Sequence, residues 1–417
     1  MPKLAVNGAA PVRDRAFHAW PVADRSDVEA VGQAILSGDW NHVTGSNIRA
    51  FETEFAELQD AKFGVACNGG TTALEIALRI AGVVPGDEVI VPSYTFIASA
   101  LAVLNVGAVP VFCDVEEDTF NIDPASAEAA ITEYTTAIMP VHFGGRAAAM
   151  GPLTATAKRR GLKIVEDACH GWGAKWRGQG LGSLGFSGGF SFQASKNLTA
   201  GEGGFVTTND PDAADLAARI RRGYSEAEGK PVVMGNNYRM TEIQAALLRS
   251  QMRRLPEQNR VRMANAEYLT DGLSELPGIH VLRRDPDVTH SSTHVYLFRF
   301  VSEELEGLPR SRFVEALRAE GIPAGTVYRA PLQEYQLFAG IPATLPGGGP
   351  LGWGRYKGSA DYTKMRTPVC DRLCKAEAIG LSQNVFLGPR GDMDDILEAA
   401  GKIRANVGEL IATAAVR

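Results

Sequence analysis

The feature that most constrains the fold is an alternation, from about residue 60 to residue 210, of short apolar runs with stretches of helical periodicity. The alternation predicts strands at Phe63–Cys67, Glu88–Val91, Val109–Phe112, Ala137–Val141, Lys163–Glu166, Gly189–Phe192 and Gly204–Thr207. Helices are expected at Thr71–Ile80, Thr95–Asn105 and Met150–Arg159. Strands that are apolar throughout and alternate with helices are typical of a parallel sheet covered on both faces. The sequence therefore predicts an α/β fold with a mostly parallel seven-stranded sheet.

One segment, Val89 to Cys113, contains no charged residue and resembles a membrane span in its hydropathy. Pro92, Ser93 and Pro110 interrupt it, so a buried strand–helix–strand unit explains it better. The first residues lack the apolar core of a signal peptide. The five cysteines have neither the spacing of a disulfide framework nor that of a metal site. We therefore expect a cytoplasmic protein without a membrane segment or a bound metal.

After about residue 240 the pattern changes. Thr241–Leu255 is predicted to be a helix capped by its first residue. An α+β region follows, with a strand at His294–Phe300. A chain of 417 residues is long enough for two domains, and we expect a large domain over residues 1–255, with an N-terminal arm, and a smaller domain over residues 256–417. The formal charge of -6 argues against a nucleic-acid-binding surface.

Residues 180–185 read Gly-Leu-Gly-Ser-Leu-Gly, which matches the G-x-G-x-x-G pattern of dinucleotide-binding loops. Such a loop needs a strand before it and a helix that begins within it, so that the pyrophosphate meets a helix N-terminus. Here a polar turn at residues 175–179 precedes the glycines, and the strand expected at residues 189–192 follows them. We therefore do not expect a nicotinamide dinucleotide to bind.

Four other features point to a different cofactor. The first is the turn Asn68-Gly69-Gly70-Thr71, which leads from a strand into a helix. Glycines let the backbone approach a ligand closely, and the free N–H groups of the first helical turn attract an anion such as phosphate. Since no lysine follows the glycines, the turn is not a nucleoside-triphosphate loop. Taken alone, it is better explained as an ordinary helix start.

The second feature is the segment Lys163–Ala168, an apolar strand that ends in the two carboxylates of Glu166 and Asp167. Functional groups gather at the carboxyl ends of such strands. Neighbouring residues of a strand point to opposite faces, so only one carboxylate is expected to take part. If Asp167 meets a pyridine nitrogen, its charge favours the protonated ring. A shift of one to two pKa units, about 1.4–2.7 kcal/mol, is within the reach of a close opposite charge.

The third feature is Lys196, the only charged residue between Gly178 and Gly201. A lysine in uncharged surroundings can have a lowered pKa and form a Schiff base with a carbonyl. The fourth is Phe96, at the end of another strand, whose ring could stack on a flat cofactor. An aromatic residue at such a place is more often part of the core. Together the four features fit pyridoxal phosphate better than any other cofactor.

At these residues the chain resembles the fold-type I aminotransferases of the sugar-modifying DegT/DnrJ/StrS group. The motifs Glu-Asp-Ala at 166–168, Phe-Ser-Phe…Lys…Gly-Glu-Gly-Gly at 190–204 and Gly-x-Asn-x-Arg at 235–239 occur in the family's order. The resemblance extends over nearly the whole chain. It implies pyridoxal-phosphate-dependent transamination and a homodimer with shared active sites.

The resemblance also implies a role for each site residue. Lys196 matches the lysine that forms the Schiff base and then transfers the proton. Asp167 matches the partner of the pyridine nitrogen, and His170 matches a residue near the cofactor ring or its 3′-oxygen. The other implied contacts are Gly70, Thr71 and Ser191 for the phosphate, Phe96 for stacking on the ring, and Asn237 for the phosphate of the neighbouring subunit.

Within the group the chain looks most like the cyclitol branch, which includes L-glutamine:scyllo-inosose aminotransferases and aminohydroxybenzoate synthases. The implied substrates are L-glutamine or L-glutamate as the amino donor and a keto-sugar or keto-cyclitol as the acceptor, in the secondary metabolism of amino sugars and aminocyclitols. Ser382-Gln383 replaces a His-His pair of some relatives, which bears on the ketone that fits. Candidates for the substrate pocket, for which a surface or core role is an equal alternative, are Trp40, Asn41, His142, Arg146, Tyr328 and Arg329.

Three alternatives remain open at this point. A pyridoxal-phosphate-dependent sugar dehydratase of the same fold has histidine in place of the lysine, so Lys196 argues against it. A non-catalytic regulator that binds the cofactor would not need Lys196, Asp167 and the phosphate turn together. An enzyme similar to the aminohydroxybenzoate synthases is the third, and the motifs above do not separate it from a transaminase.

Overall fold

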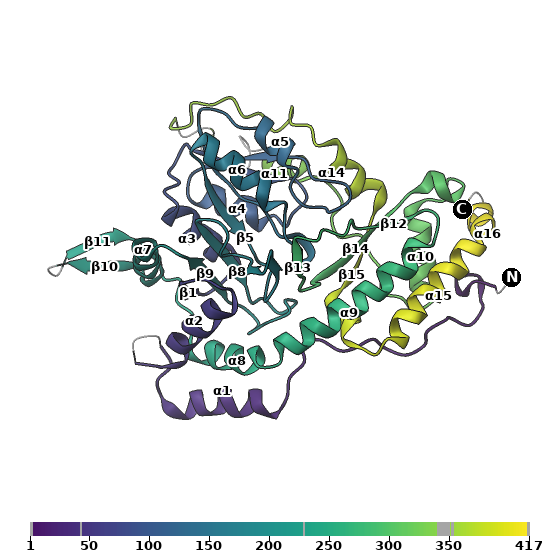
Figure 1. The fold of residues 1–417 in the computed structure, drawn as a ribbon, viewed down its shortest axis with the longest axis horizontal. Helices are drawn as coiled ribbons and strands as arrows, with labels where there is room; N and C mark the ends of the chain where they lie inside the picture. Colours follow the sequence, from purple (N-terminus) through teal and green to yellow (C-terminus); the bar gives the residue numbers. More distant parts are fainter. Residues whose placement is uncertain (1–2, 42–43, 228–229, 340–350, 352–353, 415–417) are drawn as a thin grey trace.

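Figure 1 shows the computed structural model of the chain, which describes residues 3–41, 44–227, 230–339, 351 and 354–414. Its larger part contains a seven-stranded sheet in the order β1-β9-β8-β5-β4-β2-β3. The strands are β1 (Phe63–Cys67), β2 (Glu88–Pro92), β3 (Val109–Cys113), β4 (Thr135–Ile138), β5 (Lys163–Asp167), β8 (Ser187–Ser191) and β9 (Gly204–Thr208). Only β9 runs antiparallel to its neighbours, which are β1 and β8. The mostly parallel seven-stranded sheet that the sequence predicts is confirmed.

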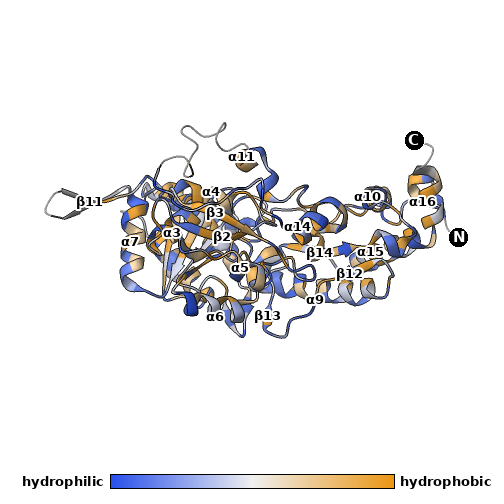
Figure 2. Cartoon of the chain, turned by 90° about the horizontal axis from the view of Figure 1, so that it is seen from above, coloured by the Kyte–Doolittle hydropathy of each residue, from blue (hydrophilic) through white to orange (hydrophobic). Residues whose placement is uncertain are grey.

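Helices cover both faces of this sheet, which is why its strands are apolar throughout. One face carries α3 (Gly70–Ile80), α4 (Ala98–Asn105) and α7 (Pro211–Arg222); the other carries α2 (Asn47–Leu58), α5 (Pro124–Ala129), α6 (Met150–Arg160) and α8 (Glu242–Met252), with α1 (Arg25–Ser37) beside α8. Alternate residues of β2 belong to the two cores: Val89 and Val91 pack on the α3 side, and Ile90 packs on the α6 side. Figure 2 shows β2 and β3 as hydrophobic strands between these helices.

The C-terminal part contains a three-stranded antiparallel sheet in the order β12-β14-β15. Its elements are β12 (Ile279–Val281), β14 (Val295–Phe300), β15 (Ala378–Ser382), α9 (Leu255–Ser274), α10 (Arg310–Ala319), α14 (Pro368–Arg372), α15 (Gly391–Ala405) and α16 (Val407–Ala414). Most of these elements share a second core, which also includes Leu4 from the N-terminus. Both ends of the chain lie at this side of the molecule in Figure 1. The predicted α+β character is confirmed, while a domain boundary at residues 255 and 256 stays a prediction.

Smaller elements connect and extend these two parts. A second three-stranded sheet in the order β13-β6-β7 joins β6 (Lys175–Trp176) and β7 (Gln179–Gly180) to β13 (Val288–His290). A hairpin of β10 (Tyr224–Ala227) and β11 (Lys230–Met234) projects from the end of α7 in Figure 1. The short helix α11 (Gln336–Ala339) packs through Phe338 on the core that contains α3 and α4.

The uncharged segment at residues 89–113 forms β2, α4 and β3, as the sequence predicts. In the part of the chain that the structure describes, no helix is both long and apolar enough to cross a membrane. The described residues also contain no group of three His, Cys, Asp or Glu side chains placed to hold a metal ion.

Candidate active site

The predicted phosphate residues come together where strands of the large sheet end. Ser191 is the last residue of β8, and Gly70 is the first residue of α3. A Cβ atom on Gly70 would lie 2.6 Å from the Ser191 Cβ, so only glycine fits at this position. The N-cap residue Gly69 offers no side chain, and within the described residues no hydrogen bond uses the N–H groups of Gly70 and Thr71. The turn is therefore able to bind an anion beside the Ser191 hydroxyl.

Asp167 ends β5, the strand next to β8, and its carboxylate is buried. Oδ2 accepts a hydrogen bond from Ser99 Oγ at 2.6 Å, and Oδ1 accepts one from the Cys169 N–H at 3.1 Å. Ser99 donates its hydroxyl proton to this carboxylate, so in the 3.0 Å hydrogen bond between Thr95 and Ser99 the donor must be Thr95. A chain of two hydroxyls thus orients Asp167. Ser99 was not among the predicted site residues, because no sequence motif marks it.

Glu166, the preceding residue, points to the other face of the sheet, and its carboxylate holds the local fold together. It is fully buried and accepts four hydrogen bonds of 2.6–2.8 Å. The donors are the backbone N–H groups of Gly182, Leu184 and Gly185 and the ring of His142. His142 Nδ1 accepts from the Ala148 N–H at 3.1 Å, so the ring proton lies on Nε2 and is donated to Glu166. His142, a candidate for the substrate pocket, is therefore a core residue.

The G-x-G-x-x-G loop encloses this carboxylate. It lies between β7 and β8, and no helix begins within it. The N–H groups of Gly182, Leu184 and Gly185, which a pyrophosphate would need, are bonded to Glu166. Gly182 has a φ of +86°, and a Cβ atom there would come within 2.6 Å of the Phe190 ring. The glycines are thus explained by packing around an internal anion, and the structure agrees with the rejection of a dinucleotide site.

We expect Glu166→Gln to lower the free energy of unfolding by about 3 kcal/mol, because an amide nitrogen in this position would face a backbone N–H that cannot reverse its polarity. Urea denaturation followed by circular dichroism would measure the change. The matched control is Glu128→Gln, since Glu128 is partly exposed and pairs with Arg159 at the surface. Equal stabilities of the two variants would contradict this role for Glu166.

Lys196 lies in the segment after β8, where its half-buried side chain faces an aromatic ring. The amine is 5.9 Å from the centroid of the fully buried Trp172 ring. Burial lowers the pKa of Lys196 below its ordinary value of 10.5, and the nearby Cys169 and Asp167 side chains act in the opposite direction. A lowered pKa increases the fraction of neutral amine, which is the form that attacks a carbonyl.

His170 also lies close to Lys196. Its ring centroid is 4.3 Å from that of His294 and 5.5 Å from that of Phe143. Burial, together with the positive charge of Lys196, lowers the pKa of His170 well below its ordinary value of 6.5. The ring is therefore neutral at pH 7. Among the residues that the structure describes, its buried Nδ1 has no hydrogen-bond partner. Because an unpaired acceptor costs less than an unpaired N–H, the ring proton belongs on Nε2.

Two further predicted residues, Phe96 and Asn237, present exposed side chains. Phe96 precedes α4 and is 61% exposed. It lies three residues before Ser99, whose hydroxyl donates to Asp167. Asn237 is exposed at the base of the β10–β11 hairpin. The next residue, Tyr238, anchors this segment to the phosphate turn, because its carbonyl accepts from the Asn68 N–H at 2.9 Å. The contact of Asn237 with a neighbouring subunit's phosphate stays a prediction.

The candidates for the substrate pocket have mixed surroundings. Tyr328 is packed between aromatic rings, with centroids 5.1 Å from Tyr94 and 5.7 Å from Phe143. Trp40 is exposed, and its Nε1 donates to the Ile35 carbonyl at 3.1 Å. Gln383, of the Ser382-Gln383 pair, is buried and accepts from Arg262 at 2.6 Å and 3.0 Å.

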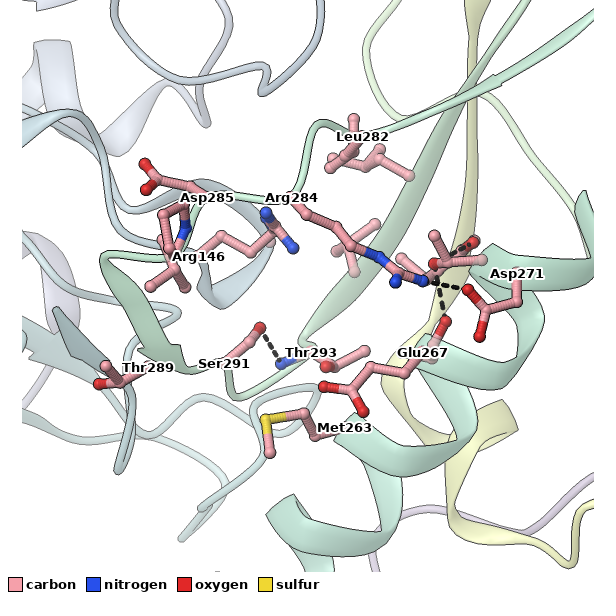
Figure 3. Close-up of a pocket in the computed structure, with 18 residues that line it drawn as sticks. Arg146, Met263, Glu267, Asp271, Leu282, Arg284, Asp285, Thr289, Ser291 and Thr293 are labelled. Atoms are coloured by element: carbon pink, nitrogen blue, oxygen red, sulfur yellow. Dashed lines mark hydrogen bonds and ion pairs between the residues drawn. The ribbon is translucent and has the colours of Figure 1, made fainter. Parts of the chain in front are cut away.

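A cavity of about 540 Å³ is lined in part by Ser291 and Thr293. The residue between them, Ser292, donates its hydroxyl to the His170 carbonyl. Figure 3 shows Arg146, Arg284 and Glu267 around it. Neither Lys196 nor Asp167 lines this cavity, so it is not the site of the chemistry described above.

The residues at the strand ends fit pyridoxal phosphate. The tight Gly70–Ser191 contact and the free N–H groups suit its phosphate, and the Asp167 carboxylate suits its ring nitrogen. The Lys196 amine suits its aldehyde, and the exposed Phe96 ring suits its flat face.

Comparison with known proteins points to the same chemistry. Residues 22–349 match the model of the DegT/DnrJ/EryC1/StrS aminotransferase family. The chain is 37% identical to an L-glutamine:2-deoxy-scyllo-inosose aminotransferase of Streptoalloteichus tenebrarius, over 98% of this chain and 99% of the relative. It is 36% identical to the L-glutamine:scyllo-inosose aminotransferase of Streptomyces griseus, again over 98% and 99%. The crystal structure of 3-amino-5-hydroxybenzoic acid synthase is similar, with a TM-score of 0.82 and 32% identity over 95% of this chain and 100% of that chain.

Proposed function

Because the chain belongs to the DegT/DnrJ/EryC1/StrS aminotransferase family, we propose that it uses pyridoxal phosphate to move the amino group of L-glutamine to a keto-cyclitol related to scyllo-inosose. The family resemblance expected from the motifs is confirmed. The proposal for the donor and the acceptor is supported by the names of relatives that match over nearly their full length.

One observation carries the proposal for the cofactor. A buried carboxylate, a primary amine of lowered pKa and an anion-binding turn meet at the ends of neighbouring strands. In this arrangement Lys196 would hold the cofactor, Asp167 would pair with its ring nitrogen, and Gly70, Thr71 and Ser191 would hold its phosphate. When bound, pyridoxal phosphate supplies the electron sink that makes the α-hydrogen of an amino acid acidic.

The protein's own residues then position and move the proton. Lys196 Nζ accepts the proton from the α-carbon of the amino donor, as a positioned general base. In the second half of the reaction, the same nitrogen returns a proton to the carbon of the acceptor that becomes aminated. Asp167, held by Ser99, would present its carboxylate to the ring nitrogen of the cofactor. The neutral His170 can donate a hydrogen bond from Nε2 without adding a positive charge next to Lys196.

We also infer that the protein forms a homodimer. Large apolar side chains that are more than half exposed in the single chain include Val28, Leu36, Trp40 and Met234. Exposed apolar side chains mark a surface that is covered in an assembly when they lie in one contiguous patch. Asn237 lies only three residues after Met234, so a subunit that covers this region would meet it. Sedimentation equilibrium that returned the mass of one chain would contradict the dimer.

The test is an absorbance experiment on the purified protein with pyridoxal phosphate. L-glutamine is expected to remove the absorbance band of the lysine-bound cofactor and to release the matching 2-keto acid. Addition of 2-deoxy-scyllo-inosose or scyllo-inosose should restore the band and yield an aminocyclitol. L-glutamate and a nucleotide-linked keto-sugar are run in parallel to test the other donor and acceptor. If the band does not respond to any amino donor, the proposed reaction is wrong.

A further inference from the structure

Residues 291–294 form a wall with two different faces. Ser291 and Thr293 line the cavity of Figure 3, whereas Ser292 and His294 contact residues around Lys196. The Ser292 hydroxyl donates to the carbonyl of His170, and both Ser292 and His294 are buried. The proposed reaction gives roles to Lys196 and His170 but none to His294.

The position of the proton on His294 follows from its neighbour Asn197, the residue after Lys196. The Asn197 amide nitrogen donates to the Ser292 carbonyl at 2.7 Å, and a carbonyl can only accept. The Asn197 Oδ1 atom is therefore the one that faces His294 Nδ1, at 2.8 Å. An amide oxygen also only accepts, so His294 carries its proton on Nδ1 and donates it to Asn197.

The His294 ring also packs against two aromatic rings near Lys196, those of His170 and Trp172. Its centroid lies 4.3 Å from that of His170 and 5.4 Å from that of Trp172. Burial, and then the positive charges of Lys196 and Arg262, lower the pKa of His294 well below its ordinary value of 6.5. His294 is thus neutral at pH 7, with its Nδ1 proton committed to Asn197. One ring therefore contacts the side chain that follows Lys196 as well as the ring of His170.

We propose that His294 is a positioning residue that fixes Lys196, through Asn197, and the ring of His170 in the geometry needed for proton transfer. The inference rests on the proposed function, because it assigns a role toward the same amine. A misplacement of about 1 Å can cost on the order of 10²-fold in rate, so one lost hydrogen bond behind the general base has a measurable effect.

Two substitutions separate the two contacts of His294. His294→Phe keeps an aromatic ring against His170 but removes the donor to Asn197. His294→Asn places an amide nitrogen near the former Nδ1 but removes the ring. We expect His294→Phe to slow the reaction with L-glutamine by about 10- to 100-fold with little change in KM, and His294→Asn to recover part of that loss. The matched control is His290→Phe, at an exposed histidine of β13, which should leave the rate unchanged.

A second readout does not depend on turnover. The absorbance of the lysine-bound cofactor is titrated with pH, because its midpoint reports the surroundings of the Lys196 nitrogen, which include Asp167, Cys169, His170 and His294. His294→Phe is expected to shift the midpoint and His290→Phe to leave it in place. Asn197→Ala, which removes the same hydrogen bond from the other side, should shift it in the same direction and should not add to His294→Phe.

The outcomes separate this inference from the proposed function. A folded His294→Phe or Asn197→Ala variant with the rate and the midpoint of the unaltered protein would overturn the role of His294 alone. An unaltered protein without a lysine-bound absorbance band would overturn both proposals. A lowered unfolding free energy with an unchanged midpoint would show that His294 stabilises the fold only, and this would also reject the inference.

Discussion

Lys196→Ala should lower the rate of transamination by at least about 10³-fold, because it removes both the nucleophile that holds the cofactor and the general base, and a positioned base alone contributes about 10²- to 10⁴-fold. The variant should still bind pyridoxal phosphate, since the Gly70 turn, Ser191 and Asp167 are unchanged. Binding would then be noncovalent, and the cofactor would keep the absorbance of a free aldehyde.

Single-turnover absorbance measurements with L-glutamine would test this expectation, with removal of the cofactor by gel filtration as a measure of covalent attachment. The matched control is Lys158→Ala, at an exposed lysine of α6. A small primary amine added to Lys196→Ala should restore part of the rate, because it can take the place of the missing side-chain base. Turnover of Lys196→Ala within about tenfold of the unaltered protein would show that Lys196 is not the general base.

The sheet could be predicted from the sequence because its signal is local. A strand buried on both faces is apolar at nearly every position, as β2 is, and this pattern does not depend on distant residues. The start of α8 could be predicted from the sequence for the same reason. Thr241 accepts from the Gln244 N–H and the Gln244 side chain accepts from the Thr241 N–H, a capping box that two residues three apart define.

The supporting contacts of the site could not be predicted in this way. Ser99 and Asp167 are 68 positions apart, and Asn197 and His294 are 97 apart. Nothing in the sequence near either residue of a pair specifies its partner, because the contact follows from how strands and loops pack in three dimensions. The motifs identify the groups that touch the cofactor, whereas the residues that orient those groups become visible only in the folded chain.

His142 is a residue for which the sequence suggests a place in the site and the structure shows a place in the core. A histidine after a strand of the large sheet was a reasonable candidate for the substrate pocket, and no local pattern indicates that its ring is completely enclosed. The Nε2–H group of His142 donates to Glu166 and its Nδ1 accepts from the Ala148 N–H, so both ring nitrogens are satisfied inside the protein. Equally, the rejection of the dinucleotide loop followed from sequence context, but the reason for its glycines required the buried Glu166 carboxylate.

Asp167→Asn should lower the rate of transamination by at least about 10²-fold, because a neutral amide no longer favours the protonated pyridine nitrogen, and a close opposite charge is worth about one to three pKa units. The effect on stability should be small, about 1 kcal/mol or less, although Asp167 is buried much as Glu166 is. The difference lies in the partners of the two carboxylates.

The donors to Asp167 can adapt to an amide, whereas those to Glu166 cannot. In Asp167→Asn the new side chain could keep its oxygen toward the Cys169 N–H and turn its nitrogen toward Ser99. Ser99 would then accept from that nitrogen and donate to Thr95, which reverses the hydroxyl chain without breaking it. In Glu166→Gln at least one fixed backbone N–H would face the amide nitrogen.

Rates with L-glutamine and urea denaturation of both variants should therefore show opposite patterns. Asp167→Asn is expected to lose activity and keep its stability, because its hydrogen bonds can rearrange around the neutral amide. Glu166→Gln is expected mainly to lower the free energy of unfolding, because the backbone donors to this side chain are fixed. If Asp167→Asn retained its rate, or lost rate and stability together, Asp167 would not be the partner of the ring nitrogen.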